Sequence, residues 1–322
     1  MNEDQGITRD TKGYASTPAG GCFLTALGFG IWLVVTLGIE ILIALSSWGE
    51  LRISLPLALI HFAFTLIFAF VFWIYLSRDP LGVMGLRLNF RALLRWLVGT
   101  AFGIMGALST VVWVMVLGGE AELSRYVMSE EAPMSLSFSV FTGISLLILY
   151  AGREEILGRG FLYPAIKRSI GLGWALLFSS FAFSALHLPN PNFSIVPAVD
   201  IFLAGIMLAL LRELTGELYL AWGAHFGWNM GLVLMGVPVS GITIFLKGQP
   251  WKVITTGSSL VTGGDFGPEG GLAGIMANVT MIVFILIALG VRKLTQGRSV
   301  RVPPEEGKGG GDQGFSSHLV VS

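Results

Sequence analysis

The chain has 322 residues, of which 53% are hydrophobic and 12% charged, and its mean hydropathy is +0.75. Because a soluble domain carries about 25% charged residues, this composition excludes an ordinary soluble domain and indicates a membrane protein. The formal net charge is zero and no long basic block occurs, so no nucleic-acid partner is expected. The single cysteine, Cys22, excludes an intrachain disulfide.

Eight apolar stretches follow a polar segment over 1–21, which lacks the basic start of a cleavable signal and is expected in the cytoplasm. A hydrocarbon core of ~30 Å needs about 20 helical residues, so each stretch is expected to cross the membrane. The expected spans are 22–45, 53–76, 93–117, 134–166, 172–188, 196–214, 217–236 and 271–291. The fourth is longer than one crossing needs and the fifth is short. The sequence thus predicts an all-α, multi-pass membrane domain over 22–291.

The distribution of Lys and Arg predicts the orientation, because these residues concentrate in cytoplasmic segments. With the N-terminus inside, inner segments hold fourteen of them, and outer segments hold only Arg52, Arg125, Lys247 and Lys252. Both termini are therefore expected in the cytoplasm. The Gly-rich tail over 292–322 is expected to be disordered.

Two connecting segments carry further predictions. Residues 81–96, with Arg87, Arg91 and Arg95 at four-residue spacing, read either as an amphipathic surface helix or as an ordinary basic flank. The long outer segment over 237–270 reads either as a lid or, preferably, as a connector.

Four polar residues lie inside the apolar stretches: Glu154, His187, His225 and Asn229. An ionisable group at the centre of a bilayer costs at least ~2.5–3.5 kcal/mol, so such groups usually face a bundle interior and mark a working site. At 1.5 Å per residue, the first three lie roughly 18, 22 and 14 Å above the inner ends of their spans. One polar cavity at mid-membrane can therefore collect them. His61 has a similar depth but no polar sequence neighbour, and is expected to be structural.

The fourth span carries two adjacent acids with different surroundings. Glu155 and Arg159 are four residues apart and share a helix face, which predicts an ion pair. Glu154 lies ~100° around the helix and is not matched by that Arg, so its carboxylate is a candidate proton acceptor. The alternative is that both acids lie at a water-exposed helix end.

A carboxylate, two imidazoles and a carboxamide support hydrolysis of an acyl bond by two routes. The carboxylate and a His can deprotonate water while His and Asn stabilise the oxyanion, or Glu with two His can hold a zinc ion. Other intramembrane protease chemistries are disfavoured. The chain has no HExxH, its Ser240-Gly241 lacks the leading Gly of a GxSG motif, and Asp265 has no second intramembrane Asp.

The order of these motifs resembles the CPBP family of intramembrane proteases, which includes CAAX prenyl endopeptidases and bacteriocin-processing or immunity proteins. The family pattern is EExxxR, then FxxxH, then HxxxN on separate spans. Here these are Glu154-Glu155 with Arg159, Phe183 with His187, and His225 with Asn229. The turn at 211–216 and the Gly-rich loop ending at 266–270 also resemble the family, so that the likeness covers about 81–291.

The resemblance implies an endopeptidase whose cavity opens to lipid and to the cytosolic side. Glu154 would be the essential carboxylate, His187 would hold water, and His225 with Asn229 would bind a metal or the oxyanion. Glu155 and Arg159 would brace the fourth span. A zinc ion, if one is used, would be held by Glu154, His187 and His225.

The expected partners are the lipid bilayer and a membrane-associated peptide or prenylated protein, in the cell membrane of a prokaryote. A prenylated C-terminus and a leader peptide both suit such a cavity. A non-catalytic immunity or binding protein of the same fold is the main alternative. A proton-coupled transporter is less favoured, because the polar residues are confined to spans four to seven and no repeat is evident.

Overall fold

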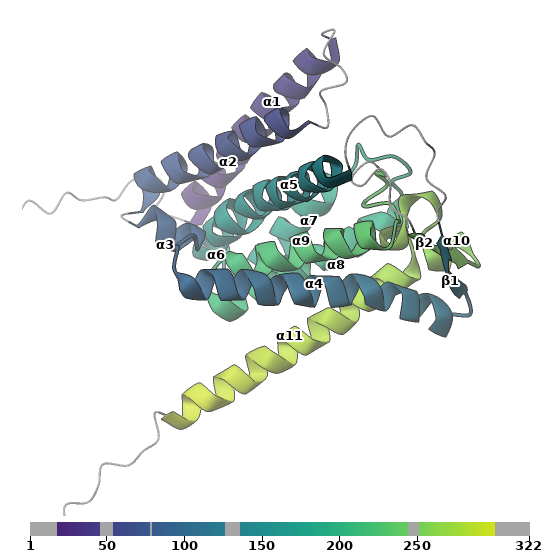
Figure 1. Ribbon diagram of the computed structural model, residues 1–322. Helices are drawn as coiled ribbons and strands as arrows, with labels where there is room; N and C mark the ends of the chain where they lie inside the picture. The colour runs from purple at the N-terminus through teal and green to yellow at the C-terminus, as the bar shows by residue number, and fades with distance from the viewer. Residues whose placement is uncertain (1–17, 46–53, 78, 126–135, 244–250, 300–322) are drawn as a thin grey trace, which may run out of the picture.

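The computed structural model describes residues 18–45, 54–77, 79–125, 136–243 and 251–299, which form a helical bundle with a small sheet at one end (Figure 1). A helix coincides with each predicted span. The long helices are α1 (Pro18–Leu45), α2 (Leu55–Leu76), α4 (Phe90–Val116), α5 (Leu136–Glu155), α7 (Leu172–Ala185), α8 (Ile195–Thr215), α9 (Tyr219–Leu234) and α11 (Leu272–Ser299). The shorter elements are α3 (Pro80–Met84), α6 (Tyr163–Ile170), α10 (Ser259–Thr262), the 3-10 turns η4 (Gly264–Phe266) and η5 (Pro268–Gly270), and strands β1 (Glu120–Arg125) and β2 (Trp251–Thr256).

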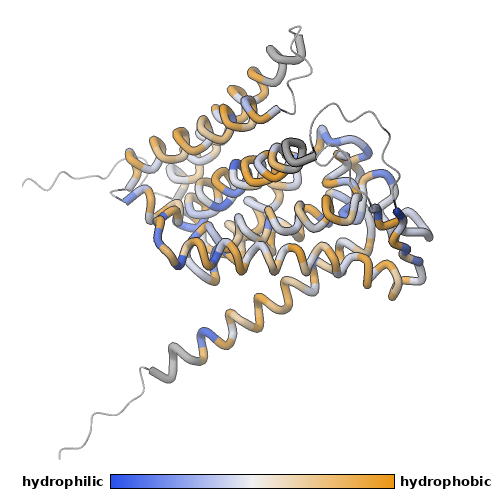
Figure 2. Tube along the Cα trace, in the orientation of Figure 1, coloured by the Kyte–Doolittle hydropathy of each residue, from blue (hydrophilic) through white to orange (hydrophobic). Residues whose placement is uncertain are grey.

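The composition of these helices makes the chain a multi-pass membrane protein. Within the described residues, five helices are long and apolar enough to cross a membrane: Ala19–Ile39 of α1, α2, α4, α8 and Leu272–Leu294 of α11. Hydrophobic residues run along them and hydrophilic residues gather toward the ends of the bundle (Figure 2). The apolar helix α7 is shorter, in line with the short fifth span. The full set of eight spans and the cytoplasmic termini stay predictions.

The apolar core has two parts. One lies among α4, α8, α9 and α11 and includes Ala107, Leu208 and Met281. The other joins α1 and α2 to the segment after α5 and includes Trp32 and Phe161. The candidate site lies where α5, α7, α8 and α9 meet.

The overlong fourth span is one continuous helical run that changes its winding. After α5 the backbone forms a π-helix, η3 (Ile156–Leu162), before α6 completes the run. All seven residues of η3 are buried. π-helical turns are rare and are frequently found at functional sites, and this one follows directly after Glu154 and Glu155.

Helices α4 and α9 pack with their backbones in direct contact through four glycines, Gly99, Gly103, Gly223 and Gly227. A Cβ atom on Gly103 would overlap the Ala224 carbonyl oxygen. One on Gly227 would overlap the Thr100 carbonyl oxygen. Each pair is spaced four residues apart, the small-xxx-small arrangement that lets membrane helices approach closely. This packing places α9, and with it His225, against the bundle.

We expect Gly103→Ala to lower the free energy of unfolding by about 1–3 kcal/mol, because the new methyl group overpacks against the α9 backbone. Gly290→Ala is the matched control, since no atom lies within 4 Å of the Cβ position on this exposed α11 glycine. Thermal unfolding in detergent measures both variants. Equal midpoints for the two would contradict the close α4–α9 contact.

The prediction of one surface helix over 81–96 is wrong, and the basic-flank interpretation fits better. Helix α3 ends at Gly85, which adopts φ +74°, and α4 begins after Asn89, whose side chain accepts the Ala92 N–H at 2.9 Å. An Asn cap of this kind starts a new helix. The exposed Asp79 carboxylate accepts the Gly82 N–H and pairs with Arg87, and these two contacts hold the pKa of Asp79 below its usual value.

The structure contains a small sheet that was not predicted, and the prediction of a disordered tail from residue 292 is wrong at its start. Strands β1 and β2 pair antiparallel, Glu120 with Thr256 and Arg125 with Trp251, so the fold is mostly helical with one added sheet. Helix α11 continues to Ser299, past the expected boundary at residue 291, and its last turns extend away from the bundle (Figure 1). The expected tail is therefore helical at its start, and residues 300–322 lie outside the described residues.

Candidate active site

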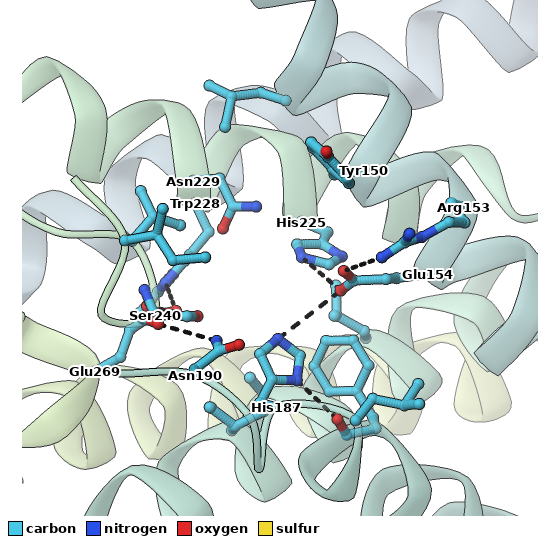
Figure 3. Close-up of a pocket in the computed structure, with 18 of the residues that line it drawn as sticks. Tyr150, Arg153, Glu154, His187, Asn190, His225, Trp228, Asn229, Ser240 and Glu269 are labelled. Carbon is cyan, nitrogen blue, oxygen red and sulfur yellow. Dashed lines mark hydrogen bonds and ion pairs between the residues drawn. The ribbon is translucent and has the colours of Figure 1, made fainter. Parts of the chain in front are cut away.

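A cavity of about 260 Å³ lies among α5, α7, α8, α9 and two loop stretches, 237–243 and 264–270, which are called the outer loop after their predicted side of the membrane. It is lined by Glu154 from α5, His187 after the end of α7, and His225 and Asn229 from α9 (Figure 3). These are the four residues that the sequence analysis expected to meet. Burial of the fourth span also rejects the alternative of acids at a water-exposed helix end, since the Glu155 side chain is fully buried.

The centre of the site is the Glu154 carboxylate, which faces both imidazoles. Its Oε2 lies 3.9 Å from His187 Nε2 and 3.8 Å from His225 Nε2. These separations are too long for direct hydrogen bonds. Glu154 Oε2 is buried and has no hydrogen-bond partner among the described residues. A small polar group such as water can bridge Glu154 and either imidazole across such a separation.

The contact of each Nδ1 atom determines whether the Nε2 atom of the same ring donates or accepts a hydrogen bond. His187 Nδ1 is 2.8 Å from the Phe183 carbonyl oxygen, and His225 Nδ1 is 3.0 Å from Glu155 Oε1. Both partners are acceptors, so each Nδ1 carries the proton and donates it. In the neutral rings both Nε2 atoms are then acceptors that face Glu154. A water molecule has two protons to donate, so it can bridge Glu154 and one of the two imidazoles at a time.

The same atoms meet part of the requirement for zinc. Carboxylate and imidazole are zinc ligands at about 2.0–2.2 Å, and zinc-bound His usually donates its other N–H to a carbonyl or carboxylate. The donor types and both Nδ1 contacts therefore fit a zinc ion. Within the part of the chain that the structure describes, however, no three His, Cys, Asp or Glu side chains gather tightly enough to form a ready-made metal site.

Glu155 and Arg159 form the ion pair predicted from their spacing. Arg159 donates to Glu155 Oε1 at 3.0 Å, and both side chains are fully buried. Arg159 also donates to the Gly205 carbonyl oxygen of α8 at 2.8 Å and lies 4.4 Å from the Phe183 ring centroid. Since Glu155 Oε1 also accepts from His225 Nδ1, the pair orients an imidazole of the site from behind the cavity wall.

Arg153 makes two contacts that were not predicted. Its guanidinium lies 3.7 Å from Glu154 Oε1, so Glu154 does have a cationic neighbour. It also lies 3.4 Å from His61 Nδ1, so His61 does have a polar contact. Helical spacing alone separates adjacent residues by ~100°, but the long Arg side chain reaches back across that angle.

The wall opposite Glu154 combines Asn190, which follows α7, with residues of the outer loop, which is more than a connector. Glu269 accepts from Trp228 Nε1 at 3.0 Å and from the N–H and hydroxyl of Ser240 at 2.5 and 3.0 Å. Ser240, Glu269 and Asn190 all line the cavity (Figure 3). None of the three was assigned a role from the sequence. The available signal was a pair of acids, Asp265 and Glu269, in an otherwise uncharged and Gly-rich run over 262–270.

A buried polar residue is also present beyond spans four to seven, contrary to the prediction. Asn278 of α11 is fully buried and donates to Asp200 of α8 at 2.9 Å. Asn278 thus removes one of the two reasons for disfavouring a transporter, the confinement of polar residues to spans four to seven. The pair stabilises the contact between α8 and α11.

Comparison with known proteins connects this geometry to a family. Residues 135–231 match the family model described as type II CAAX prenyl endopeptidase, Rce1-like. This segment holds all six residues chosen from the sequence: Glu154, Glu155, Arg159, His187, His225 and Asn229. The resemblance to CAAX-type intramembrane proteases is thus confirmed, over a narrower range than 81–291. No curated protein matches the chain.

Proposed function

We propose that this chain is an intramembrane endopeptidase in which Glu154 activates water to hydrolyse a peptide bond of a membrane-associated substrate. The observation that carries the proposal is the buried, unpartnered Glu154 Oε2 facing two imidazole acceptors 3.8 and 3.9 Å away. The match of residues 135–231 to a CAAX prenyl endopeptidase model supports the peptidase class.

The mechanism follows from the hydrogen-bonding roles of these atoms. A water in the gap donates one proton to Glu154 and the other to an imidazole Nε2, which turns its lone pair toward the substrate carbonyl. Glu154 takes the proton as the C–O bond forms and returns it to the leaving amine. The Asn229 carboxamide, which points into the cavity, donates to the oxyanion (Figure 3). Glu155 and Arg159 keep His225 in the required orientation.

Zinc remains an alternative source of activation within the same proposal. If bound, it would be held by Glu154, His187 and His225 and would supply Lewis-acid polarisation of the substrate carbonyl. The substrate is proposed to be a prenylated C-terminus or a leader peptide in the cell membrane of a prokaryote.

Cleavage of a reporter tests the proposal and separates it from a binding or immunity protein. The detergent-purified chain is incubated with an internally quenched, farnesylated peptide that ends in a CAAX sequence. We expect wild type to cleave it and His187→Ala and His225→Ala to lower kcat by about 10²-fold or more, because the two rings supply the Nε2 acceptors that orient the attacking water beside Glu154. Zinc content is measured on the same preparations.

Three outcomes would change the proposal. Peptide binding without cleavage by wild type would support the binding-protein alternative and overturn the enzyme. Stoichiometric zinc in wild type that is lost in His187→Ala would replace the metal-free route with the zinc route. Equal cleavage by wild type and both variants would remove the assigned residues from the mechanism.

A further inference from the structure

The wall opposite Glu154 contains an amide oxygen, Asn190 Oδ1, whose direction is determined by the hydrogen bond of its own amide NH₂ group. Asn190 Nδ2 donates to the Ser240 carbonyl oxygen at 2.9 Å. A carbonyl only accepts, so the NH₂ of Asn190 must face Ser240 and the amide cannot be flipped. The Asn190 Oδ1 atom consequently points into the cavity, toward the side that carries His187 (Figure 3).

Ser240 is held firmly enough to define this orientation. Its N–H and hydroxyl both donate to Glu269 Oε2, while Glu269 Oε1 accepts from Trp228 Nε1. Ser240 adopts φ +47°, a left-handed conformation that is uncommon for a residue with a Cβ atom and that its contacts with Glu269 hold in place. Glu269 is buried, with 8% of its surface exposed, so these bonds are shielded from water.

Asn190 is also tied to the residues of the proposed reaction. Its backbone N–H donates to the His187 carbonyl oxygen at 2.9 Å, which closes a single turn between the two residues. A peptide lying between the walls therefore has Glu154 on one side and Asn190 Oδ1 on the other. Its backbone N–H groups leave water on entry and need an acceptor there.

We infer that Asn190 Oδ1 accepts a hydrogen bond from a backbone N–H of the substrate beside the scissile bond. This inference rests on the proposed function and deepens it. The contact recognises the peptide backbone and not a side chain, so it binds substrates of different sequence in one register. Asn190 is thus a substrate-binding residue, and Ser240 with Glu269 fixes its orientation.

Backbone ester substitution tests the contact directly. The probe is the quenched farnesylated peptide, in a series in which one amide N–H near the scissile bond is replaced at a time by an ester oxygen. Binding is measured to the Glu154→Gln variant and to the double variant Glu154→Gln with Asn190→Ala. We expect one ester position to weaken binding by Asn190-containing protein about three- to tenfold, the effect of losing one hydrogen bond.

The losses of binding caused by the ester and by Asn190→Ala should not be additive. At that ester position, Asn190→Ala should cause no further loss, because the partner N–H is already absent. In the otherwise wild-type chain, Asn190→Ala should raise KM by a similar factor with kcat unchanged, as expected for uniform binding. Asn192→Gly is the matched control. Asn192 is exposed two residues further along at φ +58°, which Gly adopts freely, and this variant should bind as wild type.

Additive losses at every ester position would overturn the inference, as would unchanged binding in the Asn190→Ala variant. A shift of the thermal unfolding midpoint without a position-dependent ester effect would show a purely structural role and also overturn it. Failure of the proposed function looks different. If the proposed function fails, the wild-type chain binds the peptide and does not cleave it, while the ester series still shows whether Asn190 contacts a backbone N–H of the peptide.

Discussion

Glu154→Gln is expected to lower kcat for the quenched peptide by about 10²- to 10⁴-fold, the usual contribution of a general base. The amide has nearly the same shape as the carboxylate but cannot take a proton from water. KM should change little, because the side chain still fills its place between His187 and His225. Initial rates over a range of peptide concentrations separate the two parameters.

Asp265→Asn is the control for this charge removal. Asp265 is an exposed acid in the outer loop, so its neutralisation should leave both kcat and KM as in wild type. Full activity of Glu154→Gln would reject Glu154 as the proton acceptor. It would also reject Glu154 as a zinc ligand, so either route would require a different acid in the same cavity.

Helix positions and the centre of the site could be predicted from the sequence because both depend on local patterns. Long apolar stretches coincide with α1, α2, α4, α8 and α11, and length with composition determines such helices in a bilayer. The residues Glu154, His187 and His225 stand out because a polar group in an apolar stretch needs a partner. Their similar expected depths along the helices predicted one shared cavity, and all three line it.

Contacts between distant segments could not be predicted in this way. Asn190, Ser240 and Glu269 lie in connections, and their hydrogen bonds join residues 29 and 50 positions apart. No periodicity reports such a contact. The pairing of β1 with β2 is non-local for the same reason. The glycines of α4 and α9 did carry a local signal, because each pair is spaced four residues apart in an apolar helix.

The buried ion pair of the fourth span leads to the largest stability prediction. We expect Arg159→Met to lower the free energy of unfolding by about 3–5 kcal/mol, because it leaves the fully buried Glu155 carboxylate without its cation. The hydrogen bond to the Gly205 carbonyl oxygen and the contact with the Phe183 ring are lost as well. Denaturant-induced unfolding in detergent measures the loss.

The double variant Glu155→Gln with Arg159→Met separates charge from packing. If the uncompensated carboxylate causes most of the loss, removing its charge should restore much of the stability, so the double variant should be more stable than Arg159→Met alone. Its activity should nevertheless stay low, because the substituted amide can present its NH₂ group to His225 Nδ1 and no longer requires the tautomer that keeps Nε2 an acceptor. Recovery of stability together with full kcat would show that the pair only supports the fold. Recovery of stability without kcat would show that Glu155 also sets the proton position on His225.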